Sequence, residues 1–464
     1  MRCLSSLALF AILTGVCVSL SHWAQAQTLP ARPNLVVILA DDLGYGDLGC
    51  YGHPTIRTPH LDQMAREGMR FTQFYSAAEV CTPSRAALLT GRFPPRSGMC
   101  SNKRRVAFPN TTGGLPDSEM TIAELLKPKG YATACFGKWH LGHRPAYLPL
   151  KHGFDEYFGL PYSNDMDRVA SSPMGRAAFL DPKTEFWNVP LLRGTEVIER
   201  PADQHTLTHR YTDEAIRFIR DHKEGPFFVY LPHTMPHVPL FASSEFAGKS
   251  PRKLYGDVVE ELDANVGRLL QALRDEKLAE RTLVVFTSDN GPWLTQGVQG
   301  GSAGLLKDGK GSTWEGGMRV PGLAWMPGWI PAGSVSRELA STLDLLPTAA
   351  ALAGVAVPKD RPLDGYDISP ALAGGKSPRQ EMFYYRGFEL MAARLGPWKA
   401  HFQTQTGYGQ AMAEKHDPPL LFNLDVDPSE RFNVSAANPD VVKDIEALIA
   451  KHRAGMQPSP SQLE

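Results

Sequence analysis

The strongest constraint on the fold comes from short apolar runs that contain almost no polar residue. The clearest is Asn34–Ala40, which reads Asn-Leu-Val-Val-Ile-Leu-Ala, and residues 131–136, 227–231 and 282–287 repeat the pattern. Aliphatic and β-branched runs without polar alternation are typical of strands buried on both faces, as in a parallel sheet. Such a sheet needs helices on both faces, so the sequence predicts an α/β sandwich with a large, mostly parallel sheet.

Segments with helical periodicity lie between these runs. They are residues 58–67, 121–127, 209–221 and 255–273. The last has apolar residues every three or four positions, as expected for a helix with one buried face. Residues 144–202 contain few periodic segments, and loops of that length in a compact protein usually shape a site.

From about residue 358 the pattern changes to short strand-like runs without long helices between them. These runs are residues 382–385, 390–395, 398–402 and 420–424. They predict a small antiparallel sheet, closed by a helix over residues 441–453. We therefore expect a larger domain over residues 27–357 and a smaller C-terminal domain over residues 358–464.

Polar side chains follow two of the predicted strands at their carboxyl ends, where sites gather in open α/β sheets. Asp41 and Asp42 follow the first run, and Asp289 and Asn290 follow the run at 282–287. All four offer hard oxygen donors, which suit Ca²⁺ or Mg²⁺ better than zinc. Taken alone, the first pair could cap the next element and the second pair could form a turn. The occurrence of both pairs favours a metal site.

Cationic and imidazole side chains also occupy predicted strand ends or a glycine-rich loop. They are Lys138, His140, His237 and Lys310. One such side chain is usually solvated, but a cluster of them beside a metal ion would neutralise an anionic substrate and its transition state. The formal net charge of the chain is −1, so it has no general attraction to nucleic acid or to acidic membranes. Local cations must therefore bind any anionic substrate.

The segment Cys-Thr-Pro-Ser-Arg that begins at Cys81 places a cysteine just before a predicted helix. Pro83 fits the first helical position, and Gly91 is a plausible helix stop. Cys81 is thus expected at a helix N-terminus, which favours an anion, and Arg85 adds a cation one turn later. A cysteine in such a place is by itself more often a small packed hydrophobe.

With the Ala-Ala-Leu-Leu-Thr-Gly-Arg that follows, this segment resembles the signature of the type I sulfatases, whose cysteine is oxidised to formylglycine. The resemblance extends over nearly the whole mature chain. It includes residues 40–49, 137–142, 287–291, 309–311 and 314–317. Residues 143–145, 149–156 and 383–387 are more similar to N-acetylgalactosamine-6-sulfatases, and residues 159–163 to arylsulfatases.

The resemblance implies an alkaline-phosphatase-like fold and a Ca²⁺ site, with Mg²⁺ less favoured. The ligands would be Asp41, Asp42, Asp289, Asn290 and residue 81 itself. The hydrate of formylglycine would attack sulfur, forming a sulfated enzyme, and its second hydroxyl would then expel sulfate. His140 would assist that release and, with Arg85, position the hydrate. His237 would be the acid for the leaving oxygen, with Lys310 beside it.

Substrate contacts also follow from the resemblance. The sulfate would be bound by Lys138, Lys310, His237 and Ser163. In arylsulfatases a histidine follows the equivalent serine, whereas Asn164 follows it here. The substrate thus stays open between a sulfated sugar, such as galactose or N-acetylgalactosamine 6-sulfate, and an aryl sulfate.

Two further functions stay open on the sequence alone. One is a phosphonate or phosphate ester hydrolase of the same superfamily, and the other is a non-catalytic carbohydrate-binding relative in which Cys81 remains a thiol. The family implies a formylglycine-generating maturation enzyme as partner. A homodimer is compatible with the sequence.

Residues 1–26 predict a secretory signal peptide, with Arg2 as the charged start and Ala24-Gln25-Ala26 as the cleavage site. The alternative is a membrane anchor, which the short and interrupted apolar run disfavours. We therefore expect export to the periplasm or the cell exterior, or to the lysosome in a eukaryote. The mature chain would keep Cys50, Cys81, Cys100 and Cys135, which allow at most one disulfide within a monomer if Cys81 is converted.

Overall fold

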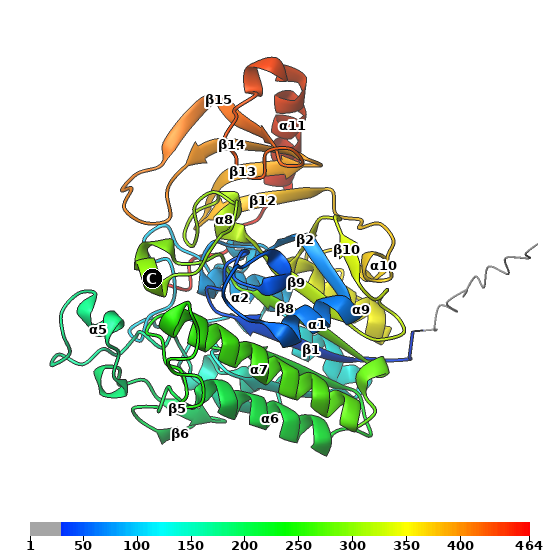
Figure 1. Cartoon of the computed structure of the whole chain (residues 1–464). Helices are drawn as coiled ribbons and strands as arrows, with labels where there is room; N and C mark the ends of the chain where they lie inside the picture. The colour runs from blue at the N-terminus through cyan, green and yellow to red at the C-terminus, as the bar shows by residue number, and fades with distance from the viewer. Residues whose placement is uncertain (1–28) are drawn as a thin grey trace, which may run out of the picture.

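The computed structural model describes residues 29–464, and the predicted signal peptide lies outside these described residues. They form a large sheet with helices on both faces and a small sheet that lies against one side of it (Figure 1). The strands of the large sheet are β1 (Asn34–Ala40), β2 (Met69–Tyr75), β3 (Ala132–Phe136), β4 (Glu156–Gly159), β5 (Leu191–Arg193), β6 (Glu196–Glu199), β7 (Phe227–Pro232), β8 (Thr282–Ser288), β9 (Arg319–Trp325), β10 (Ser334–Ser336) and β11 (Ala340–Ser341). The small sheet holds β12 (Glu381–Arg386), β13 (Glu389–Leu395), β14 (Trp398–Thr404) and β15 (Glu414–Asn423).

Six helices match predicted segments to within a few residues. They are α1 (Pro59–Glu67), α2 (Cys81–Thr90), α4 (Ile122–Leu126), α6 (Leu207–Asp221), α7 (Lys253–Asp275) and α11 (Pro439–Gly455). The helices α3 (Pro94–Ser97), α5 (Ala177–Leu180), α8 (Glu315–Met318), α9 (Leu345–Ala353) and α10 (Ser369–Leu372) were not predicted. The stretch at 144–202, expected to be mainly loop, contains the short elements β4, α5, β5 and β6.

The strand order of the large sheet is β10-β2-β9-β8-β1-β7-β3-β4-β5-β6, and β11 also pairs with β2. Its centre is parallel: β1 pairs with β8 and β7, and β7 pairs with β3. Antiparallel pairs occur where β9 meets β2 and β8, and at β4, β5 and β6. The prediction of a mostly parallel sheet is therefore confirmed.

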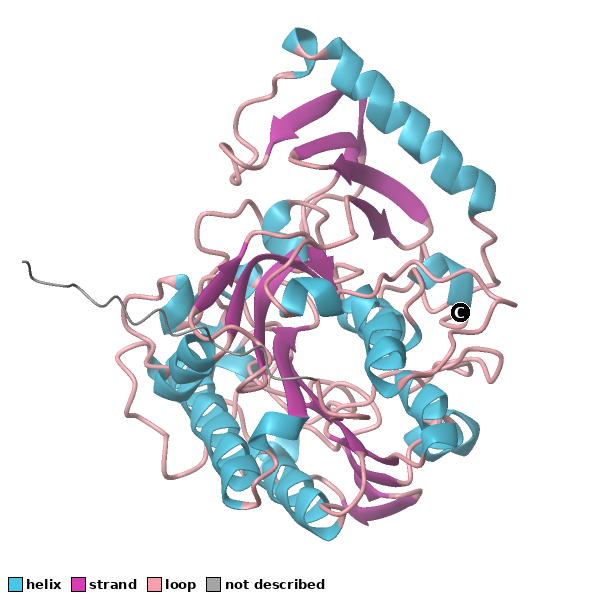
Figure 2. Ribbon diagram, turned by 90° about the vertical axis from the view of Figure 1, so that its right-hand side faces the viewer, coloured by secondary structure: helices cyan, strands magenta, loops and turns pink. Residues whose placement is uncertain are grey.

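Strand β1 shows why its sequence lacks polar alternation. Val36 and Ile38 pack into the core beneath α1, α6 and α7, whereas Leu35 and Val37 pack into the core beneath α2, α4 and α9. Figure 2 shows these helix layers on the two sides of the sheet. Since both faces are covered, every residue of the strand is buried.

The prediction for the helix after Cys81 is partly wrong. Helix α2 begins at Cys81, with Val80 as its N-cap, so Pro83 is the third helical residue and not the first. Proline is tolerated there because the first-turn N–H groups have no partner within the helix. Gly91 ends the helix with φ 66°, as predicted.

The C-terminal strands form an antiparallel sheet in the order β12-β13-β14-β15, with α11 packed on it. This confirms the predicted change of architecture, while the domain boundary at 357/358 stays a prediction. Of the helices in residues 29–464, none has the length and apolar content needed to cross a membrane. The four cysteines of this part of the chain are free thiols.

Candidate active site

The site lies at one edge of the large sheet, where the parallel strands β8, β1, β7 and β3 end side by side. Asp41 follows β1, Lys138 follows β3, His237 lies on the loop after β7, and Asp289 follows β8. The N-terminus of α2 brings Cys81 to the same edge, since the Cys81 thiol lies 3.5 Å from Asp41 Oδ1. Residues spread over much of the chain thus converge because parallel strands place their carboxyl ends together.

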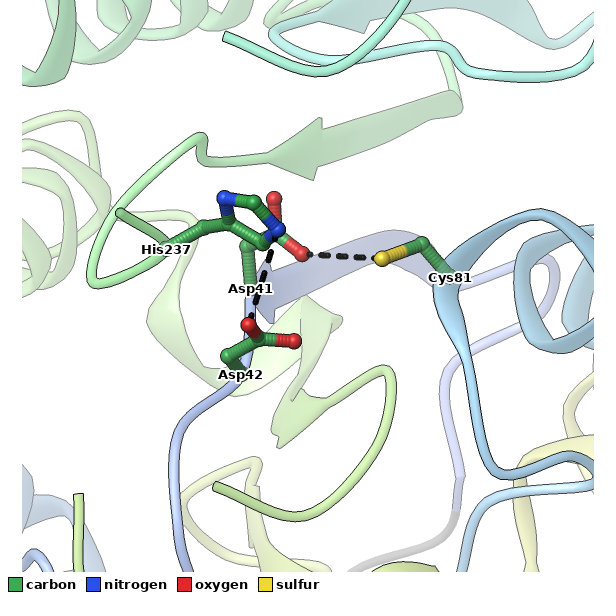
Figure 3. A group of neighbouring side chains, drawn as sticks. All are labelled: Asp41, Asp42, Cys81 and His237. Atoms are coloured by element: carbon green, nitrogen blue, oxygen red, sulfur yellow. Dashed lines mark hydrogen bonds and ion pairs between the residues drawn. The ribbon is translucent and has the colours of Figure 1, made fainter. Parts of the chain in front are cut away.

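Four buried side chains form the centre of the site. Ligand atoms of Asp41, Asp42, Cys81 and His237 all lie within 4.8 Å of one another (Figure 3). Such a group can hold a metal ion, although the identity of the ion does not follow from it. Asp42 has φ 64°, a left-handed conformation that aspartate tolerates better than most residues.

Asp289 and Asn290 extend this group, as the sequence predicted. Asp289 Oδ1 accepts a hydrogen bond from the Asp42 amide at 3.2 Å, and Asn290 Nδ2 donates to Asp42 Oδ1 at 2.7 Å. Asn290 Oδ1 is buried and has no hydrogen-bond partner among the described residues. A buried acceptor without a partner costs free energy, so a cation bound to this oxygen would satisfy it.

Arg85 is fully buried and binds carboxylates of two strand ends. Its Nε and Nη2 lie 2.9 and 2.8 Å from Asp289 Oδ2, and Nη2 lies 3.4 Å from Asp41 Oδ1. Its Nη1 donates to the Lys138 carbonyl at 2.7 Å. These contacts hold the acidic residues and the Lys138 backbone in place, and the expected role of Arg85 toward an oxyanion stays a prediction.

Two lysines form ion pairs with Asp41 and Asp42. Lys138 Nζ lies 2.5 Å from Asp41 Oδ2 and donates to Ser163 Oγ at 3.0 Å. Lys310 Nζ lies 2.9 Å from Asp42 Oδ2. Lys138 and Ser163 are therefore neighbours, as the resemblance implied for two sulfate ligands.

The hydrogen bonds of the two histidines indicate their tautomers. His140 Nε2 lies 2.9 Å from the Ala107 carbonyl, which can only accept, so Nε2 carries the proton and Nδ1 has a free lone pair. His237 Nδ1 donates to the Val238 carbonyl in the same way, which leaves Nε2 unprotonated at 3.6 Å from Asp42 Oδ2. Burial holds the pKa of both rings well below the usual range, and Lys138 lowers that of His140 further. Burial therefore favours the neutral form of both rings.

Burial also controls the charges of the acidic group. It raises the pKa of Asp289 to about 7, with the Asp41 carboxylate adding to the effect, and it raises the pKa of Asp42. For Asp41, burial is outweighed by Lys138 and its neighbouring cations, which hold the pKa well below the usual range. A divalent cation would favour the ionised form of all three carboxylates.

The Cys81 thiol is fully buried, and burial raises its pKa well above the usual range. Because the thiolate is the reactive form of cysteine, an unmodified Cys81 is a poor nucleophile here.

Several residues near the site were not predicted. Trp293 lies beneath Lys310, whose Nζ is 4.4 Å from the ring centroid, and the Tyr408 ring stacks on Trp293 at 5.1 Å. Trp293 follows the Asp289–Asn290 pair closely, which could have indicated it. Tyr408 comes from the loop between β14 and β15, and no local pattern indicates a site in that loop.

Comparisons with known proteins agree with this geometry. The family model described as Sulfatase matches residues 33–355, and the one described as C-terminal region of aryl-sulfatase matches residues 377–464. The chain is 43% identical to dog N-acetylgalactosamine-6-sulfatase, covering 94% of this chain and 88% of that protein. It is 44% identical to human arylsulfatase A, covering 93% and 90% respectively.

A solved structure supports the same relationship. The crystal structure of Ps i-CgsB in complex with k-i-k-neocarrahexaose is 34% identical, has a TM-score of 0.78, and covers 92% of this chain and 94% of that one. This likeness confirms the alkaline-phosphatase-like fold expected from the sequence.

Proposed function

This chain belongs to the sulfatase family and is a sulfuric ester hydrolase, and we propose that it removes sulfate from a sulfated sugar through a formylglycine formed from Cys81. The observation that carries the proposal is the position of Cys81. It lies at the start of α2, in contact with Asp41, in a group that also holds Lys138 and Lys310. An aldehyde hydrate at this position would stand beside acids that can hold a metal ion and cations that can hold a sulfate.

The metal ion in this proposal is Ca²⁺. Its ligands would be Asp41, Asp42, Asp289 and Asn290, with residue 81 contributing an oxygen after conversion. The donor set supports the assignment, since these four side chains offer oxygen atoms and no residue from 29 to 464 hydrogen-bonds to Asn290 Oδ1. When bound, the ion would stabilise negative charge on the oxygens around sulfur.

Hydrated formylglycine would supply a nucleophile that displaces the alcohol and is regenerated when sulfate leaves. The high pKa of the buried thiol supports this proposal, because Cys81 would not act as a nucleophile without conversion. Conversion requires a formylglycine-generating enzyme as partner, acting before α2 is buried.

The remaining side chains bind sulfate and move protons. Lys138, Lys310 and Ser163 would bind sulfate oxygens, and Arg85 would fix Lys138 and the acidic residues. Nδ1 of His140, which has a free lone pair, would take the proton that is released as sulfate leaves. Nε2 of His237 must first gain a proton to act as the acid for the leaving oxygen, whereas Lys310 beside it already carries one.

The relatives of this chain suggest a sulfated sugar as its substrate. One relative is named for N-acetylgalactosamine 6-sulfate, another for aryl sulfates, and Ps i-CgsB was crystallised with a neocarrahexaose. We propose a sulfated galactose-type sugar, with aryl sulfates as artificial substrates. We also propose that the chain is exported, which would place it with extracellular or lysosomal polysaccharides.

Parallel assays test this function. We expect 4-nitrophenyl sulfate and galactose 6-sulfate to be hydrolysed faster than 4-nitrophenyl phosphate and a matching phosphonate monoester, and Cys81→Ala to lose all activity. Faster cleavage of the phosphonate would indicate a phosphonate ester hydrolase instead. Full activity in Cys81→Ala would contradict the nucleophile, and no activity in the fully converted protein would indicate a binding protein.

A further inference from the structure

A separate cavity of about 400 Å³ lies between the small sheet and the N-terminus of α2. Val80 and Pro83, which flank Cys81 in the sequence, contribute to its lining. The small sheet contributes residues from β12, β13, β14 and the loop after β14, which reaches from the small sheet toward the large one (Figure 1). The cavity is thus next to the candidate active site but lined by different side chains.

Arg386, at the end of β12, lines this cavity beside Glu389, its cross-strand partner on β13. Its Nη1 donates to the carbonyls of Gly311 and Thr406, at 2.6 and 3.2 Å. Within residues 29–464 no carboxylate pairs with Arg386, and its Nε and Nη2 make no hydrogen bond. Burial and the nearby Arg105 lower the pKa of this guanidinium. An anion in the cavity would relieve both effects and use the two free donors.

Arg105 and Lys103, the other two cations of the lining, are already paired with carboxylates. Arg105 Nη2 lies 3.2 Å from Glu79, and Lys103 Nζ lies 3.0 Å from Glu464. Glu389 is exposed and accepts a hydrogen bond from Asn102 at 3.3 Å. The lining holds three cations and two carboxylates, and Glu464 outside it offsets the charge of Lys103, so the free N–H groups of Arg386 are the donors left for an anion. Glutamine side chains of the lining can hydrogen-bond sugar hydroxyls.

Arg105 connects the cavity to the sulfate-binding lysine. Its Nη2 donates to the Gly311 carbonyl at 2.7 Å, one residue after Lys310. Its guanidinium lies 5.0 Å from the centre of the Tyr408 ring, which stacks on Trp293 beneath Lys310. A saccharide that extends from Lys310 toward Arg105 would pass these aromatic rings.

We propose that this cavity binds a second sulfate group, carried by the same oligosaccharide whose first sulfate is hydrolysed at position 81. The inference rests on the proposed function and makes it narrower: the substrate is a polysulfated saccharide, and Arg386 selects it through its free N–H groups.

The test compares kcat/KM for three substrates that share the sulfated sugar to be cleaved: the single sugar, a disaccharide with a neutral neighbour, and a disaccharide whose neighbour carries sulfate. We expect wild type to prefer the disulfated compound by about tenfold over the neutral disaccharide, the value of one good charge-assisted contact. Arg386→Gln should lose this preference, and Lys103→Gln should reduce it.

Lys376→Gln is the matched control, because Lys376 and Lys103 are both exposed and both pair with a glutamate, and Lys376 lies outside the cavity. It should keep the preference. An equal loss on all three substrates in Arg386→Gln would show that Arg386 only supports the Lys310 loop, and would overturn the inference.

Further arms identify the source of the anion. A disaccharide with a carboxylate on the neighbour should be cleaved more slowly than the disulfated one, and inorganic sulfate should not accelerate cleavage of the neutral disaccharide. The opposite result in either arm would contradict a sugar-borne sulfate. Hydrolysis of sulfate esters without a preference for the disulfated disaccharide would reject this inference alone. No hydrolysis of any sulfate ester would reject the proposed function.

Discussion

The buried ionic cluster between the two sheets leads to a prediction about how the small sheet supports the active site. Lys399, on β14, donates to the Thr313 carbonyl and to Glu315 Oε1, each at 2.9 Å, and lies 3.0 Å from Glu430 Oε1. All three charged side chains are fully buried. Residue 313 lies on the loop that runs from Lys310 to α8, so Lys399 holds this loop against the small sheet.

We predict that Lys399→Met destabilises the protein by about 3 kcal/mol. Methionine keeps the aliphatic stem but leaves Glu315 and Glu430 without their shared cation, and breaking a buried pair costs about 3–5 kcal/mol. The lower end applies because Glu315 keeps Arg319 at 3.4 Å and Glu430 keeps His401 at 2.6 Å. Burial alone would raise the pKa of Glu315, and Lys399 is the main charge that lowers it to about 2.

Denaturant unfolding in the presence of Ca²⁺ would measure this effect. The matched variants are Glu315→Gln and the double variant with Lys399→Met, which removes both charges of the pair. We expect the double variant to lose less unfolding free energy than the two single variants lose together, because the two residues are in contact. The kcat/KM on 4-nitrophenyl sulfate should fall in Lys399→Met, since the loop carries Lys310.

Two results would refute this reasoning. One is a loss of stability below about 0.5 kcal/mol in Lys399→Met, the size of an ordinary surface substitution. The other is strict additivity in the double variant, which would mean that Lys399 and Glu315 do not stabilise each other.

The other predictions concern the metal ion, the leaving group and acid stability. Chelation should lower both activity and the unfolding temperature, Ca²⁺ should restore both, and Asn290→Ala should need a higher Ca²⁺ concentration; a chelator without effect on wild type would contradict the metal site. His237→Gln should slow sugar sulfates by about 10²–10⁴-fold but 4-nitrophenyl sulfate far less, because a good leaving group needs little acid catalysis; equal losses would argue against His237 as the acid. Burial lowers the pKa of His233 to about 3, whereas an unfolded histidine titrates near about 6.5. The unfolded state therefore binds more protons between these two pH values. Lowering the pH through that range should decrease the free energy of unfolding by up to about 1.4 kcal/mol per pH unit. In His233→Leu the slope of unfolding free energy against pH should be smaller by that amount, and an unchanged slope would contradict a neutral His233.

Much of the fold could be predicted because the strands carry a local signal. Asn34–Ala40 was predicted to the residue, since a strand covered on both faces tolerates almost no polar side chain. The convergence of Asp41 and Asp289 also followed from local sequence, because both follow parallel strands. The position of Pro83 was wrong because the whole first turn of a helix accepts proline, so the residue does not fix the helix start.

The rest depends on contacts between distant segments. Arg85 contacts residues that follow β1, β3 and β8, and no local pattern in the sequence shows these contacts. Tyr408 and Arg386 reach the region of the site only because the small sheet packs against the large one. The roles assigned to His140, His237 and Ser163 remain predictions, and the variants above test the main ones.

The mass of the tryptic peptide spanning residues 71–85 tests the central claim most directly, because it reports the chemical state of residue 81 in the active protein. Conversion of the thiol side chain to an aldehyde predicts a mass about 18 Da below that of the cysteine peptide, as the covalent nucleophile requires. A fully active preparation in which this peptide carries only an unmodified cysteine would contradict the account.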